Sequence, residues 1–492
     1  MILSLILIPF IGALSAFVLR KDSLRKAVLV FSAFAHFILC LGSWRIAFAP
    51  IFGGVFSIDN LGRLFLSVTS ILFLICSVYV VVYLKAEREG IKKDIEERFL
   101  FRNMNQNIFI GCLLLFLTSM TLVTLSRHFG ILWVSMEATT LFSAPLIFFH
   151  RHHRSLEAVW KYLIICSVGI ALALIGNIFL SAAFSTSGGN SVDLLIIELT
   201  NKNIFVNTFW LKGAFIFLLI GYGTKMGLAP MHSWLPDAHS EAPSAVSALL
   251  SGALLNCAFL SILRIYQVCG VHGLGEFCRE LFIMFGVLSI AFSVVFIIGQ
   301  KDYKRMLAYS SIENMGILIL GIGLGGSAVF GSLLHAVNHS FAKAMLFLVS
   351  GNILRVYKTK LVYEVKGVFK TLRLSGFLWF AGFLVISGMP PFGIFISKFI
   401  ILKSAFNQGH YILGTLFLIM LAMVFISMAV IFINMSIGDS NIDIDDKTVK
   451  PSLGLFIPPL MFFILVLFLG LYIPQFLTNF LTSAASVIGG GL

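Results

Sequence analysis

Long apolar runs divide this sequence, and most are about 20 residues long, the length that a helix needs to cross a bilayer. Only 12% of the 492 residues are charged and 59% are hydrophobic, whereas about a quarter of the residues in a soluble domain are charged. Lipid offers no hydrogen-bond partners, so lipid-exposed loops and open sheet edges are excluded at membrane depth. The chain is therefore predicted to be an all-α polytopic membrane protein.

By this measure we predict fourteen membrane spans and no separate soluble domain. The first run lacks a basic leading segment and a small-residue cleavage site, so we interpret it as a span and not as a signal peptide. The predicted spans are residues 2–19, 27–47, 62–84, 105–125, 129–149, 156–184, 209–229, 243–268, 277–299, 304–324, 327–353, 374–405, 411–436 and 453–480.

Lysine and arginine are concentrated in the connections that follow odd-numbered spans, such as 85–102, 301–305 and 355–373. Cytoplasmic loops carry an excess of these cations. The predicted orientation therefore places these connections in the cytoplasm and both termini on the outer, periplasmic side of the cell (inner) membrane. Because this topology accounts for the net charge of +13, we expect a lipid bilayer around the chain and no nucleic-acid partner.

Seven cysteines are spread along the chain, and none forms a CxxC or CxxH cluster. Isolated cysteines in apolar runs behave as small hydrophobic side chains, whereas metal sites need ligands at characteristic spacings. We therefore expect no zinc or iron–sulfur site, and no metal or cofactor in this chain.

Five charges are predicted to lie within spans: Glu137, Lys161, Lys225, Lys343 and Lys398. Each charge near the bilayer centre costs roughly 2.5–3.5 kcal/mol on insertion scales. They must therefore face protein or water, and pair with other groups or change their protonation. Structural ion pairing between helices is one interpretation. The other is a proton or cation pathway, because a desolvated lysine readily changes its proton affinity.

Glu137 and Lys225 are predicted to form a functional pair, because each is a single deep charge in the same half of the chain. A nearby carboxylate raises the pKa of a lysine, and burial lowers it. Moving the carboxylate by a few ångströms would therefore load or release a proton.

A polar stripe is predicted in the span 327–353, where His335, His339 and Lys343 are spaced at i, i+4 and i+8 on one helix face. We interpret it as a proton relay. HxxxH is also a metal-binding spacing, but the third ligand would have to be Lys343, which binds metals poorly at neutral pH. Polar packing between helices is the other alternative.

Two spans are interrupted by proline and glycine, in KMGLAPMHSWLP and in SGMPPFGIFISKFI. Such breaks are tolerated at membrane depth where they line a cavity, and a corresponding pair of breaks in two halves indicates inverted repeats. We predict discontinuous spans 7 and 12 and two inverted five-helix repeats, spans 4–8 and 9–13. Glu137 and Glu313 then correspond, although Glu313 near a span end is also compatible with a solvated role. The predicted divisions are an N-terminal segment 1–104, repeats 105–268 and 269–436, and a C-terminal segment 437–492.

Four stretches carry a resemblance to a known family: LAPMHSWLPDAHSEAPSAVSALLSG, KDYKRMLAYSSIENMG, HAVNHSFAKAMLFLVSGN and GMPPFGIFISKF. They resemble the antiporter-like membrane subunits of respiratory complex I, Mrp antiporters and group 4 nickel–iron hydrogenases, over about residues 60–480. Two further stretches look most like membrane component F of hydrogenase-4 and formate hydrogenlyase-type complexes. They are MEATTLFSAPLIFFHR and SLEAVWKYLIICSVGIALALIGN.

The resemblance implies two half-channels joined by a central polar axis. It also implies that this chain carries no redox centre and that partner subunits hold the nickel–iron and iron–sulfur centres. Asn256 stands where many relatives have a lysine that links the halves, and Asn314 where many have a histidine. Asparagine can hold water but cannot titrate. The positions that match the family's pathway residues are Glu137, Lys225, His335, His339, Lys343 and Lys398, with His232 and His239 in the connection after span 7.

The sequence thus favours a proton-translocating subunit, with sodium as an alternative ion, in a membrane-bound hydrogenase complex. Its partners would be other membrane subunits and a peripheral hydrogenase arm. The alternatives are a pumping subunit of complex I (NADH:quinone oxidoreductase), an Mrp-type cation/proton antiporter subunit, and a structural membrane anchor whose charges serve assembly.

Overall fold

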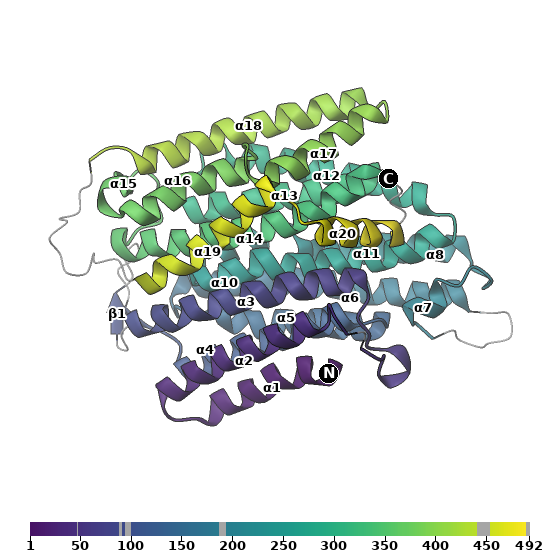
Figure 1. Cartoon of the computed structure of the whole chain (residues 1–492), viewed down its shortest axis with the longest axis horizontal. Coiled ribbons are helices and arrows are strands. Elements are labelled where there is room, and N and C mark those ends of the chain that lie inside the picture. Colours follow the sequence, from purple (N-terminus) through teal and green to yellow (C-terminus); the bar gives the residue numbers. More distant parts are fainter. Residues whose placement is uncertain (47, 88–90, 94–99, 186–192, 440–452, 489–492) are drawn as a thin grey trace.

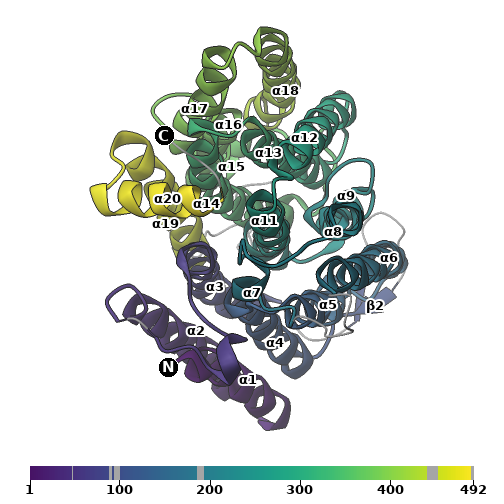
Figure 2. The same ribbon diagram turned by 90° about the vertical axis from the view of Figure 1, so that its right-hand side faces the viewer.

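A computed structural model describes the chain except for residues 47, 88–90, 94–99, 186–192, 440–452 and 489–492. Long helices lie side by side along one direction (Figure 1) and form a broad bundle when viewed from their ends (Figure 2). The long helices are α1 Ile2–Val18, α2 Asp22–Gly42, α3 Asn60–Ala86, α4 Gln106–Leu125, α5 Phe129–Ile147, α6 His153–Phe184, α8 Thr208–Met226, α11 Leu255–Val271, α12 Gly275–Ile297, α13 Tyr303–Leu324, α14 Ser327–Tyr357, α16 Arg373–Ser387, α17 Gly393–Asn407, α18 Tyr411–Ser436, α19 Leu453–Leu471 and α20 Gln475–Val487.

Short elements connect these helices. Strands β1 and β2 pair in antiparallel orientation between α3 and α4. The short elements are η1 Phe52–Gly54, β1 Ile91–Lys93, β2 Leu100–Arg102, α7 Ile196–Leu199, α9 Trp234–Glu241, α10 Ser244–Leu249, the π-helical η2 Leu250–Leu254, and α15 Val368–Thr371.

Every predicted span overlaps at least one helix of the structure. Within the described residues, ten helices are long and apolar enough to cross a membrane, and α1 and α16 are shorter apolar helices. A predominantly helical membrane architecture is therefore confirmed, while the number fourteen and the inverted repeats stay predictions.

Connections from alternate spans meet at opposite ends of the bundle. At one end, Asn103 bridges to His150, and Asp302 to Leu361. At the other end, Phe56 bridges to Ser126, and His128 to Leu195. These contacts are expected of a chain that runs from one end to the other with each successive span.

Helices α11, α13 and α14 lie inside the bundle, near the middle of the end-on view (Figure 2). Almost every residue of α13 and most residues of α14 are buried, including their serine, asparagine, histidine and lysine side chains. A buried helix that carries polar groups needs partners for them inside the protein. The polar groups predicted to be functional are therefore concentrated where the surroundings are protein and not lipid.

The two predicted breaks have the same local structure. Helix α8 ends at Gly227 (φ 81°), with Leu228 N donating to Gly223 O, and α16 ends at Gly388 (φ 83°), with Met389 N donating to Leu384 O. This six-residue hydrogen bond, closed by a glycine in the left-handed region, is the Schellman ending of a helix. After each of these two breaks, the chain passes through proline before the next helix, α9 or α17, begins.

A third irregularity, which the sequence did not predict, is the π-helical segment η2 between α10 and α11. Its Gly252 packs closely against α14, because a Cβ atom placed there would lie 3.0 Å from the carbonyl oxygen of Ser340. Single π-helical turns inside α-helices are frequent at functional sites.

Arg264, near the end of the predicted span 243–268, is completely buried in α11. Both of its terminal nitrogens donate to the carboxylate of Asp59 at 2.6 Å, and Arg127 lies 2.7 Å from the same carboxylate. Burial alone would raise the pKa of Asp59, but the charges of Arg264 and Arg127 outweigh burial and hold this pKa well below its usual range. Asp59 also accepts from Gly62 N and so caps α3.

We expect Asp59→Asn to destabilise the protein by about 3 kcal/mol at neutral pH, because it leaves a buried guanidinium without its counter-charge. The carboxylate contributes stability above its unfolded pKa of about 3.9, and this contribution is lost as pH falls toward the lower folded pKa. Thermal unfolding in detergent at several pH values measures the effect. A difference between wild type and variant that did not shrink on acidification would contradict this assignment.

Candidate functional site

Lys225 lies in the last turn of α8, directly before the break, and is completely buried. Its ammonium donates to the hydroxyl of Thr140 and, at 3.2 Å, to that of Tyr162, whose ring centre is 5.1 Å from the nitrogen. Tyr162 in turn lies 2.6 Å from the hydroxyl of Ser143. These hydroxyls supply the oxygen partners that a buried charge requires.

Glu137, the predicted partner of Lys225, is joined to it through a single hydroxyl. Thr140 Oγ1 donates to Glu137 Oε2 at 3.2 Å and accepts a hydrogen bond from Lys225. Glu137 is only partly buried on α5. The structure thus brings the two charges together across one threonine, an arrangement that a small movement of the carboxylate would interrupt.

Lys343 lies in the middle of α14 and is completely buried. Its ammonium donates to the carbonyl oxygen of Leu307 at 2.6 Å and to the hydroxyl of Ser310, both on α13. These partners are uncharged, so the neighbouring helix supplies dipoles and not a direct counter-ion at this point.

Lys398 and Glu313 form a buried ion pair with a distance of 3.0 Å. Glu313 is 1% exposed, which excludes the solvated role that its position near a span end allowed. The Lys398 ammonium also donates to the carbonyl oxygen of Ile386, at 3.3 Å, in the last turn of α16. This carbonyl precedes the break, so the broken span supplies a backbone oxygen to a buried lysine.

Asn314 connects these groups. Its amide nitrogen donates to Glu313 Oε2 at 3.3 Å and to the carbonyl oxygen of Ser310, whose hydroxyl accepts from Lys343. Its amide oxygen lies 2.9 Å from His335 Nε2, and His335 Nδ1 lies 2.8 Å from the hydroxyl of Ser397. Although Asn314 cannot titrate, it joins Lys343, Glu313 and His335 into one network.

Several buried side chains of α9, α11 and α14 have polar atoms without a protein partner. Both ring nitrogens of His239 and of His339 lack one, as do both amide atoms of Asn338 and the amide oxygen of Asn256. Buried polar groups are nearly always hydrogen-bonded, and ordered water satisfies those that protein does not reach. The chemistry of this region therefore suits a chain of water molecules.

Asn256 lies just after the π-helical turn. Its amide nitrogen donates to the carbonyl oxygen of Gly252 at 3.0 Å and to the hydroxyl of Ser340 on α14 at 2.7 Å. The residue that stands in place of a linking lysine thus still connects α11 to the polar face of α14.

The rings of His335 and His339 are 6.3 Å apart, and no group of three or more metal-ligating side chains occurs among the described residues. All seven cysteines are buried and unpaired.

Lys161 and His232 lie apart from these networks. The Lys161 side chain is 45% exposed and pairs with Glu157 and Asp237, so it is not the deep charge that the sequence predicted. His232 packs against the rings of Phe292 and Tyr309.

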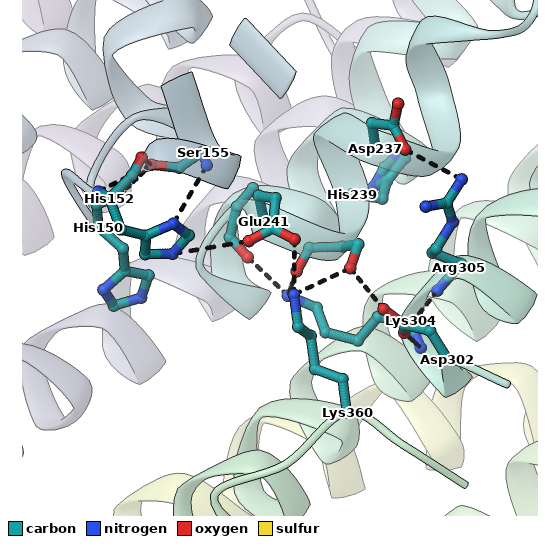
Figure 3. Close-up of polar contacts among 12 residues, drawn as sticks. His150, His152, Ser155, Asp237, His239, Glu241, Asp302, Lys304, Arg305 and Lys360 are labelled. Carbon is teal, nitrogen blue, oxygen red and sulfur yellow. Dashed lines mark hydrogen bonds and ion pairs between the residues drawn. The ribbon is translucent and has the colours of Figure 1, made fainter. Parts of the chain in front are cut away.

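Sequence reasoning also missed a polar cluster at the end of α9 (Figure 3). Lys360 pairs with Glu241 at 2.6 Å, and the hydroxyl of Ser240 donates to Asp302 at 2.6 Å. Lys304, assigned to a connection from the sequence, is 1% exposed and donates to the carbonyl oxygens of Ser240 and Ala242. Because this cation stands at the very start of an apolar run, hydropathy alone could not place it inside the protein.

Replacing Lys398 with Met is expected to destabilise the protein by about 3 kcal/mol, because Glu313 would stay buried without its counter-charge. Adding Glu313→Gln should recover part of this loss, with a coupling free energy of at least about 0.5 kcal/mol. Thermal unfolding in detergent of both single variants and the double variant measures the coupling. Lys403→Met, on the exposed side of the same helix, serves as the control, and strictly additive losses would contradict a buried ion pair.

Comparisons with known proteins agree with this geometry. The family described as NADH:quinone oxidoreductase/Mrp antiporter, TM, matches residues 126–424. The Hydrogenase-4 component F homolog of Methylacidiphilum infernorum (isolate V4) is 34% identical over 412 residues, which cover 82% of this chain and 84% of that protein.

Solved structures share the fold. A chain of the membrane-bound sulfane sulfur reductase, an archaeal respiratory membrane complex, gives a TM-score of 0.84 at 22% identity, covering 100% of this chain and 98% of that one. A chain of the Mrp complex from Dietzia sp. DQ12-45-1b gives 0.82 at 21% identity, covering 99% and 98%. The family match over residues 126–424 and the 34% identical relative show that this chain belongs to the NADH:quinone oxidoreductase/Mrp antiporter family of membrane subunits.

Proposed function

We propose that this chain is the proton-translocating subunit of a membrane-bound nickel–iron hydrogenase complex of the hydrogenase-4 or formate hydrogenlyase type. One observation carries the proposal: buried lysines, each beside titratable or polar side chains, follow one another through the middle of the bundle. The name and 34% identity of the Methylacidiphilum relative favour the hydrogenase type. A complex I subunit and an Mrp-type antiporter subunit are the alternatives, and both have the same fold.

The proposed pathway uses Glu137 and Lys225 in the first half, and Lys343, His335, His339 and Lys398 in the second. A carboxylate near a lysine stabilises its charged form. Displacing Glu137 from Thr140 removes that support and favours release of a proton from Lys225. In the second half, Asn314 and Glu313 connect Lys343 to Lys398, so a change of charge on one lysine acts on the other. The ion is a proton, because each site is occupied by a titratable lysine of the chain.

The two breaks support a division into inverted repeats at 105–268 and 269–436, flanked by segments 1–104 and 437–492. Both breaks have the same glycine ending. Ile386 precedes Gly388 by the same two residues as Lys225 precedes Gly227, and the Lys398 ammonium reaches the Ile386 carbonyl oxygen. The ammonium of Lys398 thus lies beside Ile386, the backbone position that corresponds to Lys225. In sequence, however, Lys225 precedes its break and Lys398 follows its break.

Partners would complete the function. This chain would hold no redox centre, and other membrane subunits and a peripheral hydrogenase arm would supply nickel–iron and iron–sulfur chemistry. The end of the bundle that gathers Arg154, Lys304, Arg355 and Lys360 would face the cytoplasm, in keeping with the positive-inside rule. Both termini would then lie on the periplasmic side of the inner membrane.

We predict that Glu137→Gln and Lys225→Met abolish proton translocation while the complex still assembles. Each variant removes a titratable group from the first half without adding a charge. Proton uptake by membrane vesicles that contain the whole complex, driven by its redox reaction, measures the effect. The matched control for Lys225→Met is Lys212→Met, because Lys212 is an exposed lysine of the same helix, α8.

Unchanged proton uptake in both variants would contradict the proposal. If the charges served only assembly, as in a structural anchor, both variants would lower the yield of purified complex and leave uptake per complex unchanged. Copurification of a nickel–iron subunit supports the hydrogenase type, whereas an NADH- or quinone-binding subunit would place the chain in complex I.

A further inference from the structure

A cavity of about 440 Å³ lies at the end of the bundle where α9, α13 and α14 meet. Its lining includes Ser240, Glu241, Lys304, Arg355 and Lys360. These residues come from connections that follow odd-numbered spans or from the helix ends beside them. The cavity therefore carries an excess of positive charge and is located at the bundle end proposed to face the cytoplasm.

Lys304 separates this cavity from the interior. It lines the cavity but is 1% exposed, and its ammonium donates to the carbonyl oxygens of Ser240 at 3.0 Å and Ala242 at 2.7 Å. These carbonyls are at the C-terminal end of α9, where helix carbonyls lack partners within the helix. The neighbouring Lys360 has Glu241 as a direct counter-ion, whereas the partners of Lys304 are neutral. Figure 3 shows Lys304 beside Lys360 below the end of this helix.

His239 is the next polar side chain inward. It precedes Ser240, is completely buried, and stacks on Phe347 of α14 with ring centres 4.9 Å apart. Neither ring nitrogen has a protein hydrogen-bond partner. The imidazole lies within electrostatic range of both Lys304 and Lys343. His239 thus stands between the lysine at the cavity wall and the lysine at the centre of α14.

We infer that this cavity is the aqueous entrance to the second half of the pathway and that Lys304 transfers protons from it to His239. The inference rests on the proposed function. Water in the cavity gives a proton to the neutral amine of Lys304. A bridging water carries a proton from the resulting ammonium to one ring nitrogen of His239, and the other ring nitrogen releases its proton toward Lys343. Lys304 returns to the amine, so one proton has moved inward and no redox change has occurred.

Chemical replacement of the amine tests this role. We expect Lys304→Cys, in the whole complex, to lower proton uptake by about 100-fold, the lower end of what a positioned proton-transfer group contributes. Alkylation with 2-bromoethylamine rebuilds a lysine-like amine at residue 304 and should restore uptake. A methanethiosulfonate that attaches a trimethylammonium group supplies a fixed charge that cannot release a proton, and should not restore it. Wild type treated with the same reagents is the reagent control, since all seven native cysteines are buried and none is among the described residues that line the cavity.

Two further variants separate proton transfer from structure. Lys304→Arg keeps a cation able to bond the two carbonyls but cannot deprotonate, so the complex should assemble and fail to take up protons. Lys358 lines the same cavity at an exposed position. Neither Lys358→Cys nor its modified forms should therefore change uptake. Normal uptake in Lys304→Arg, or rescue by the fixed charge, would overturn the inference. Failure of the proposed function would look different, because wild type itself would then take up no protons.

Discussion

A lysine within a membrane must be surrounded by oxygen atoms of the protein, and much of this structure follows from that requirement. Lys225 has two hydroxyls, Lys343 a carbonyl and a hydroxyl, and Lys398 a carboxylate and a carbonyl. Such partners lie where helices pack against one another, and the polar helices α13 and α14 are almost entirely buried. The break before α17 contributes directly, since it frees the carbonyl that Lys398 uses.

The two halves hold their carboxylates differently. Glu313 contacts Lys398 directly, whereas Glu137 reaches Lys225 only through Thr140. Direct pairing stabilises a charged lysine more strongly than pairing through a hydroxyl, because Coulomb energy falls with distance. The first half is thus the one in which a small displacement of a carboxylate most easily changes the charge of the lysine. Under the proposed function, the partly exposed Glu137 would be the group that a neighbouring subunit displaces.

Hydropathy and isolated charges predicted the helices, both breaks, and the positions of Lys225, Lys343 and Lys398, because a cation inside an apolar run is easily recognised. Charges at the ends of runs were not predictable in this way: Lys304 and Arg264 are buried, while Lys161 is exposed. Thr140, Tyr162 and Ser310 were missed because a hydroxyl in an apolar run has no distinctive signal until its partner is placed beside it. The π-helical turn before Asn256 likewise depends on the close approach of α14, which no local pattern encodes.

Lys343 is the central position of the proposed pathway, because the proposed entrance through His239 and the network that leads to Lys398 meet there. The direct measurement is the number of protons translocated per redox turnover by the assembled complex that carries Lys343→Met. A fall to the background of uncoupled vesicles, with redox turnover retained, is the predicted result. An unchanged ratio of protons to turnovers would show that protons do not pass through the centre of this chain.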